Sequence, residues 1–367
     1  MSIKEDGFLH CDFDENDEAF YMQVCPASGK QNQRNPQNTI WGNGKVYLGW
    51  SNNKDVRQKA SSGGILTEVL SYLLDSGKVE AVIQTKCNDE MPWETELVLS
   101  TKREEIIQNC GSRYSDSASL YNISELLNRY STFAYVGKPC DVIALKNYMQ
   151  VDELAKKKIL YTFSFFCAGV PSRIANRALL RKMGCKVEDC ISLNYRGNGW
   201  PGFATAIDKN GKEYTLPYEE AWGKILGRDI RKSCRFCFDG IGLEADIACC
   251  DAWYQNESGR PDFSEKEGRN AIFTRTDNGD QIIKEMKESG LITAVETEFG
   301  ESLKKIQAYQ KERRATMLVR ILALKLTLKS APKYPTNEML KLVKVVGLRR
   351  QWQIFKGTIK RIYEGKI

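Results

Sequence analysis

Four cysteines of this chain stand where a thiol could bind a metal. Cys234 and Cys237 form a CxxC pair, and this spacing lets two thiolates reach one metal ion. Zinc sites, iron–sulfur clusters and redox dithiols all use it. Cys140 follows a Gly–Lys–Pro turn, and Cys167 ends an apolar run that precedes a glycine. Both are candidates for the further ligands because α/β folds place their sites at the carboxyl ends of strands.

Two short motifs could bind an anionic group. SSGG at 61–64 precedes a predicted helix, whose free first-turn amides could cradle a phosphate. The alternative is a simple helix cap with a close helix contact. GSRY at 111–114 combines a glycine turn, a hydroxyl, a cation and an aromatic ring. Arg113 could stabilise an anionic cofactor there, or it could form an ordinary loop salt bridge.

A third motif, NYRGNGWPG at 194–202, supplies Arg196 and a flexible glycine turn around Asn198. It suits either a lid over a cofactor or a solvent-exposed hairpin. Asp246 and Asp251 flank the last predicted core strand. Either carboxylate could anchor Arg196 or a ribose hydroxyl, or could serve only as a structural cap.

The order of these motifs is more specific than any one of them. They are SSGG (61–64), GSRY (111–114), GKPC (137–140), FFCAGVPS (165–172), NYRGNGWPG (194–202), CRFC (234–237) and ADIACCDAW (245–253). In this order and spacing the chain resembles the coenzyme F420 hydrogenase/dehydrogenase beta-subunit family. The resemblance covers about residues 45–300.

The resemblance implies a flavoprotein that also carries an iron–sulfur cluster. It implies that the SSGG segment helps to bind the flavin, FAD (or FMN). Together with the candidates from the residue types, the predicted cofactor contacts are Ser61, Ser62, Gly63, Gly64, Thr67, Gly111, Ser112, Arg113, Tyr114, Arg196 and Asn198. The resemblance assigns a 4Fe–4S cluster to Cys140, Cys167, Cys234 and Cys237. Structural zinc is the alternative metal, one of the four could be only a core thiol, and Cys249 and Cys250 are reserve ligands.

The chain departs from the family pattern at several positions. Lys138 and Asp141 replace the residues of the commoner GTPCQ form, Cys250 stands where glycine is usual, and Arg113 stands where lysine is usual. The changes at Lys138 and Asp141 alter the donors around the predicted ligand Cys140, which could reflect a different redox partner or substrate.

The function implied by the resemblance is that of an oxidoreductase. It would pass electrons between a redox partner and a small substrate or a deazaflavin-type coenzyme such as F420, with a link to polysaccharide biosynthesis as a further expectation. The alternative function is a non-catalytic electron-transfer or scaffold subunit that docks a partner complex through its tail. The catalytic residues stay unassigned.

Composition limits the chemistry. The chain has 367 residues and a single histidine, His10, so histidine-based triads and His-rich zinc catalysis are excluded. No apolar run is long enough to span a bilayer, and the first residues lack the apolar core of a signal peptide. We therefore expect a cytoplasmic protein, in which cysteines serve as thiols or metal ligands rather than disulfides.

Charge is concentrated at the end of the chain. Residues 301–367 carry 17 Lys and Arg against 4 Asp and Glu, whereas the other 300 residues carry 37 against 43. Basic residues among exposed aromatics would suit peripheral contact with an anionic membrane surface, at the inner face of the membrane. The alternative is a Leu-rich helix packed on the body with solvated charges. Nucleic acid is disfavoured because no recognised module accompanies the charge.

Local patterns predict the elements that would position these residues. Strands are expected at 45–50, 79–85, 94–100, 131–137, 157–166, 244–250 and 270–276, helices at 62–75, 139–149, 172–183 and 278–288, and hairpins within 191–216. This alternation predicts an α/β fold with a mixed core and a strand-rich second half. The expected divisions are a degenerate ferredoxin-like arm (1–44), a flavin and iron–sulfur core (45–300) and a basic helical tail (301–367).

Overall fold

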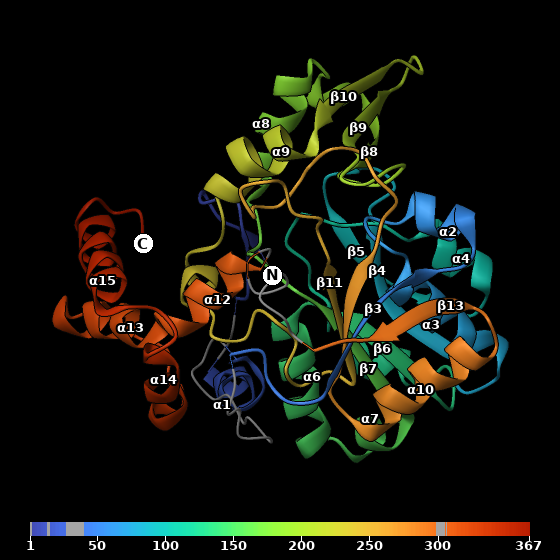
Figure 1. Ribbon diagram of the computed structural model, residues 1–367, viewed down its shortest axis with the longest axis horizontal. Helices are drawn as coiled ribbons and strands as arrows, with labels where there is room; N and C mark the ends of the chain where they lie inside the picture. The colour runs from blue at the N-terminus through green and yellow to red at the C-terminus, as the bar shows by residue number, and fades with distance from the viewer. Residues whose placement is uncertain (1, 13–14, 27–39, 299–304, 306) are drawn as a thin grey trace.

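An eight-stranded mixed sheet organises the molecule, which confirms the predicted α/β class (Figure 1). The computed structural model describes residues 2–12, 15–26, 40–298, 305 and 307–367. Across the sheet the strands run in the order β13 (Ile292–Glu296), β3 (Lys45–Ser51), β12 (Asn270–Thr274), β11 (Ile247–Asp251), β7 (Ile159–Phe165), β6 (Phe133–Gly137), β4 (Ala81–Cys87) and β5 (Thr95–Ser100).

The centre of the sheet is parallel. Strands β4, β6, β7 and β11 pair in parallel, whereas β5, β12, β3 and β13 join antiparallel. Parallel strands end at one common edge, and the loops that leave that edge are the usual place for a ligand site in α/β folds. The GKPC and FFCAGVPS motifs begin at the ends of β6 and β7, and ADIACCDAW contains β11 together with the residues that follow its end.

The two faces of the sheet bury separate cores. Along β4, Val82 packs in one core with helices α3 (Ile65–Asp75) and α10 (Asp277–Glu288). Its neighbours Ala81 and Ile83 pack in the other core with α6 (Pro139–Val151) and α7 (Glu153–Lys158). This alternation follows from the two-residue period of a strand. It explains why near-continuous apolar runs mark the central strands.

Most predicted elements are present with small shifts at their ends. Helix α3 begins at Ile65 rather than at residue 62, and residues 157 and 158 belong to α7 rather than to β7. Strand β13 was not predicted. The remaining helices and turns of the body are α2 (Lys54–Lys59), α4 (Arg103–Gln108), α5 (Ile123–Leu126), η2 (Val187–Asp189), α9 (Tyr218–Glu220), η3 (Ala221–Ile225), η4 (Leu226–Arg228) and η5 (Lys232–Phe236).

A small lobe stands beyond the carboxyl edge of the sheet. It consists of helix α8 (Arg173–Met183) and a three-stranded antiparallel sheet of β10 (Glu213–Pro217), β9 (Phe203–Asp208) and β8 (Cys190–Asn194) (Figure 1, top). The predicted hairpins within 191–216 are therefore present.

The two ends of the chain also pack on the body. The first residues form β1 (Ser2–Ile3), β2 (Leu9–His10) and α1 (Glu15–Val24), but 27–39 of the predicted ferredoxin-like arm lie outside the described residues. The tail forms α12 (Ala308–Ala315), α13 (Met317–Leu326), α14 (Thr336–Val343) and α15 (Leu348–Tyr363), with α13–α15 set to one side of the sheet (Figure 1, red). No helix among the described residues is both long and apolar enough to cross a bilayer.

Candidate functional site

A cavity of about 640 Å³ opens at the carboxyl edge of the parallel strands. Its walls come from the ends of β6, β7 and β11, the start of α3, the GSRY loop and the tail helix α12. It collects nine of the eleven residues predicted to bind a cofactor, namely Ser61, Ser62, Gly64, Thr67, Gly111, Ser112, Arg113, Tyr114 and Arg196. A cavity of this size is in the range that holds a cofactor-sized ligand.

The start of α3 forms a polar wall of the cavity. Gly64 is the N-cap residue and has a φ of +78°, which glycine adopts without strain. The amides of Leu66 and Thr67 lie in the first helical turn, where no intrahelical acceptor exists, and both residues line the cavity. The Ser112 N–H donates to Ser61 Oγ at 2.7 Å, which ties SSGG to GSRY. The arrangement suits an anionic group.

Two predicted residues do not line the cavity. A Cβ added to Gly63 would stand 2.8 Å from both the backbone nitrogen and the Oδ1 atom of Asn270. Gly63 is therefore required by close chain packing rather than by room for a ligand. Asn198 is exposed, in the left-handed backbone region at φ 53°.

Arg113 contributes a half-buried cation to the cavity. Its Nη1 and Nη2 atoms donate to the carbonyls of Ser112, Asn109 and Cys110 at 3.1–3.4 Å. Its Nε atom is buried and has no partner among the described residues. A buried donor without an acceptor is costly, so this side chain favours an anionic ligand over an empty site.

Arg196 is held in a buried aromatic setting. Its Nη1 and Nη2 atoms donate to the Asp251 carboxylate at 2.9 and 3.1 Å. The guanidinium stands 4.4 Å from the ring centroid of Tyr218 and 5.1 Å from that of Trp253. Burial lowers the pKa of Arg196, but Asp251, Tyr114 and Tyr218 together outweigh that effect, and the net pKa is raised. The side chain stays a cation at one wall of the cavity.

The structure selects between the two predicted carboxylate anchors. Asp251 forms the ion pair with Arg196 and also accepts a hydrogen bond from Trp200 Nε1 at 2.9 Å. Asp246 instead accepts from Thr162 and Thr276, where it joins β7 to the start of α10. Asp246 therefore has a structural role.

The four predicted cysteine ligands gather at the same edge. Cys140 lies in the first turn of α6, Cys167 follows β7, and Cys234 and Cys237 lie at η5. Cys167 lines the cavity, and its N–H donates to the Gly240 carbonyl at 2.9 Å. The other three do not line the cavity.

The thiols influence one another electrostatically. Burial, and next the charge of Cys234, raises the pKa of Cys167 to about 11. Burial raises the pKa of Cys237 to about 12, with Arg313 opposing the shift and Cys234 and Cys167 adding to it. Burial also raises the pKa of Cys140, and both Cys167 and Cys237 contribute. Cys140, Cys167 and Cys237 are therefore protonated thiols at neutral pH without a metal.

The donor set fits a thiolate-bound metal in its chemistry. Two buried cations, Lys138 and Arg313, lower the pKa of these thiols and would offset thiolate charge. Lys138 also pairs with Asp141 at 2.7 Å. Within the described part of the chain, no three His, Cys, Asp or Glu side chains are grouped closely enough to hold a metal ion. The ligand set therefore stays a prediction.

The tail helix α12 reaches this region, which the sequence patterns did not indicate. Arg313 Nη2 donates to the Cys167 carbonyl at 2.8 Å and to Gln310 Oε1 at 2.6 Å. Arg314 Nη1 donates to the Phe238 carbonyl at 2.8 Å. A Cβ on Gly240 would stand 1.4 Å from Arg313 Nη2, so the close approach of Arg313 requires a glycine there.

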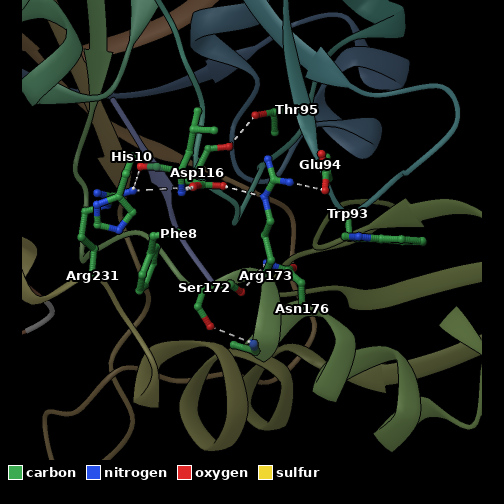
Figure 2. A network of polar contacts seen from close by, with 12 residues as sticks. Phe8, His10, Trp93, Glu94, Thr95, Asp116, Ser172, Arg173, Asn176 and Arg231 are labelled. Carbon is green, nitrogen blue, oxygen red and sulfur yellow. Dashed lines mark hydrogen bonds and ion pairs between the residues drawn. The ribbon is translucent and has the colours of Figure 1, made fainter. Parts of the chain in front are cut away.

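A polar network fastens the first residues to the GSRY loop (Figure 2). Asp116 accepts from the Leu9 N–H and from Arg173 Nε, and it pairs with Arg231 Nη2 at 3.6 Å. Arg231 Nη2 also donates to the Leu9 carbonyl at 2.7 Å. Asp116 is two residues beyond Tyr114, so β2 stabilises the loop that lines the cavity.

Replacing Asp116 with alanine should make residues 2–10 detach more often from the GSRY loop. The variant removes the acceptor of the Leu9 amide and leaves Arg173 without one of its two carboxylates. Charged hydrogen bonds contribute about 1.5–3 kcal/mol, so amide hydrogen exchange at residues 2–10 should accelerate by about tenfold or more. Asp12→Ala, at an exposed ion pair with Lys4, is the control. Unchanged exchange in Asp116→Ala would show that the network does not hold the segment.

Comparison with known proteins gives a consistent family assignment. Two family models match, described as the coenzyme F420 hydrogenase/dehydrogenase beta subunit N-term over residues 46–124 and its C terminus over 130–298. Coenzyme F420 hydrogenase subunit beta of Methanothermobacter thermautotrophicus is 24% identical over 275 residues, covering 72% of this chain and 89% of the relative. The F420-dependent formate dehydrogenase subunit beta of Methanocaldococcus jannaschii is 25% identical over 216 residues, covering 56% and 52%.

A solved structure shares the fold. A chain of the F420-reducing NiFe hydrogenase complex from Methanosarcina barkeri superposes with a TM-score of 0.62 at 20% identity, covering 80% of this chain and 98% of that one. At this identity the match shows the fold alone. Both family models end by residue 298, so helices α12–α15 lie outside them.

Proposed function

Because the chain belongs to the coenzyme F420 hydrogenase/dehydrogenase beta-subunit family, we propose that it is a flavin- and 4Fe–4S-dependent oxidoreductase. Its redox partner would be another protein or a coenzyme, and its substrate a small molecule or a deazaflavin-type coenzyme. The relatives are named as beta subunits of F420-linked hydrogenases and dehydrogenases, which supports both a partner protein and a deazaflavin. The link to polysaccharide biosynthesis stays a prediction.

One observation carries the flavin part of the proposal. Nine of the eleven residues predicted to bind a cofactor line one cavity, although they come from three segments far apart in the sequence. The first turn of α3 and the Arg113 side chain would bind the phosphate part of FAD or FMN. Arg196, fixed by Asp251, would supply positive charge beside the ring system, with Tyr218 and Trp253 as an aromatic wall.

The cysteines would hold the second cofactor. Cys140, Cys167, Cys234 and Cys237 would ligate the cluster, and Arg313 and Lys138 would offset its negative charge. When bound, a flavin exchanges a hydride with its substrate and a 4Fe–4S cluster carries single electrons. The residues of the chain would orient these groups, and Tyr309 and Gln310 of α12 form part of the cavity wall.

The direct test is anaerobic purification followed by quantification of flavin, iron and acid-labile sulfide. We expect about one flavin and about four irons per chain. Bleaching of the flavin by reduced coenzyme F420 would support an enzyme that uses this coenzyme. A chain that binds neither flavin nor iron would contradict the proposal.

A second candidate function is a non-catalytic electron-transfer or scaffold subunit, which is favoured by the names of the relatives as subunits. Cluster without flavin in the same purification would support it. The basic tail would then be its docking element.

Flavin affinity should depend on Arg113. Replacing it with methionine removes a half-buried cation, and with it the Nε donor that has no partner among the described residues, while keeping most of the side-chain volume. A charge-assisted hydrogen bond contributes about 1.5–3 kcal/mol, so the Kd for flavin should rise by about ten- to a hundredfold. Titration of the apoprotein with flavin, followed by fluorescence quenching, measures this change.

The matched control is Arg129→Met, at an exposed arginine whose side chain forms an ion pair with Glu125. Its flavin Kd should stay at the wild-type value. Equal affinities for Arg113→Met and wild type would remove Arg113 from the proposed site.

A further inference from the structure

Helix α15 carries an apolar stripe of which three residues are exposed and two are half-buried. Leu348, Trp352, Phe355, Ile359 and Tyr363 recur at spacings of three or four residues, which places them on one face of the helix. Leu348, Trp352 and Tyr363 are 82%, 56% and 80% exposed. A different face is buried against the rest of the tail, through Gln351, Ile354, Thr358 and Ile362. The stripe is therefore additional to the packing that holds α15 in place.

A row of cations runs beside the stripe. Arg349, Lys356 and Lys360 each follow a stripe residue by one position, which is about 100° around the helix. Lys356 Nζ stands 5.0 Å from the ring centroid of Trp352, whose ring stacks on Phe355 at 5.4 Å. The sequence has no acidic residue from 339 to 363. The exposed side of α15 is thus both apolar and basic.

The neighbouring helix α13 has the same character. Its inner side packs Met317, Ile321 and Leu324 with Phe236 and Phe238 of the body. It exposes Leu322 and Leu326, and Leu328 just beyond its end is 95% exposed. Lys325 and Lys329 lie among these leucines and are exposed. One face of α13 therefore packs on the body, and another exposes leucine and lysine side chains.

We propose that the exposed faces of α13 and α15 bind an anionic membrane surface. These faces carry Leu322, Lys325, Leu326 and Lys329 on and just beyond α13, and Leu348, Arg349, Trp352, Lys356, Lys360 and Tyr363 on α15. An amphipathic helix with cations and interfacial aromatics lies in the plane of the headgroups, where each cation contributes about 1 kcal/mol. The charge favours a lipid surface over a second copy of the chain, because a symmetric contact would bring this row of cations against itself. The proposal does not depend on flavin or cluster binding.

The test is co-sedimentation of the full chain with vesicles of phosphatidylglycerol and phosphatidylcholine, or of phosphatidylcholine alone, at low and high salt. We expect binding to the anionic vesicles that weakens at high salt. Leu348→Ser with Trp352→Ser should weaken binding by about tenfold or more, since it removes two apolar anchors. Lys356→Gln with Lys360→Gln should also weaken it by about tenfold or more, and mainly at low salt.

The control is Ile191→Ser, in strand β8 of the small lobe, where Ile191 is 57% exposed. Its binding should equal that of wild type. Absence of binding to anionic vesicles at low salt would overturn the proposal, as would equal binding to neutral vesicles or no effect of the two double variants. The surface would instead be assigned to a second copy of the chain if the wild type bound no vesicles and formed a dimer that dissociates when Leu348→Ser and Trp352→Ser are introduced together.

Discussion

Replacing Cys234 or Cys237 with serine is expected to remove most iron and sulfide from the anaerobically purified protein and to abolish its broad visible absorbance. Both residues lie at η5, and the charge of each thiolate raises the pKa of another predicted ligand. Serine keeps the size of the side chain but is not a competent cluster ligand, because the thiolate is the group that binds iron. Iron, sulfide and zinc are measured per chain on the same sample.

The matched control is Cys185→Ser, at a free cysteine that is buried in the core of the small lobe. It should retain the iron and sulfide of the wild type. Full iron and sulfide in both Cys234→Ser and Cys237→Ser would show that the proposed ligand set is wrong. Zinc in place of iron in the wild type would instead favour a structural metal.

Replacing Arg196 with methionine should cost about 3–5 kcal/mol of the free energy of unfolding. The guanidinium is buried and forms a two-point ion pair with Asp251, so the substitution leaves that carboxylate without its main partner. Breaking a buried ion pair from one side is more destabilising than removing both charges, because an uncompensated charge remains. Urea unfolding of the protein without added cofactor measures the loss.

The double variant Arg196→Met with Asp251→Asn separates charge from packing. It should recover a large part of the stability lost in the single variant, since no buried charge is left unpaired. Flavin affinity should stay low in both, because the cation at the cavity wall is missing. An Arg196→Met protein as stable as the wild type would show that the ion pair contributes little to the free energy of unfolding.

Much of the site was predictable because its signals are local. SSGG before an apolar helix, glycine turns in GSRY, and a CxxC pair can be recognised within a few residues, and strand ends can be found from apolar runs that stop at glycine or proline. The antiparallel edge strand β13 was missed because the short run Ile292–Glu296 has no strong period of its own. It is stabilised by pairing with β3, more than 240 residues earlier.

Sequence alone determined the α/β class, the family resemblance and the residue types available for chemistry, since periodicity and motif spacing are properties of neighbouring residues. The tertiary structure decided which distant groups meet. It paired Arg196 with Asp251 rather than Asp246, set Gly63 against Asn270, and brought Arg313 of the tail to the carbonyl of Cys167. Such contacts depend on how whole elements pack, and no local pattern encodes the burial and charge balance that selects one partner over another.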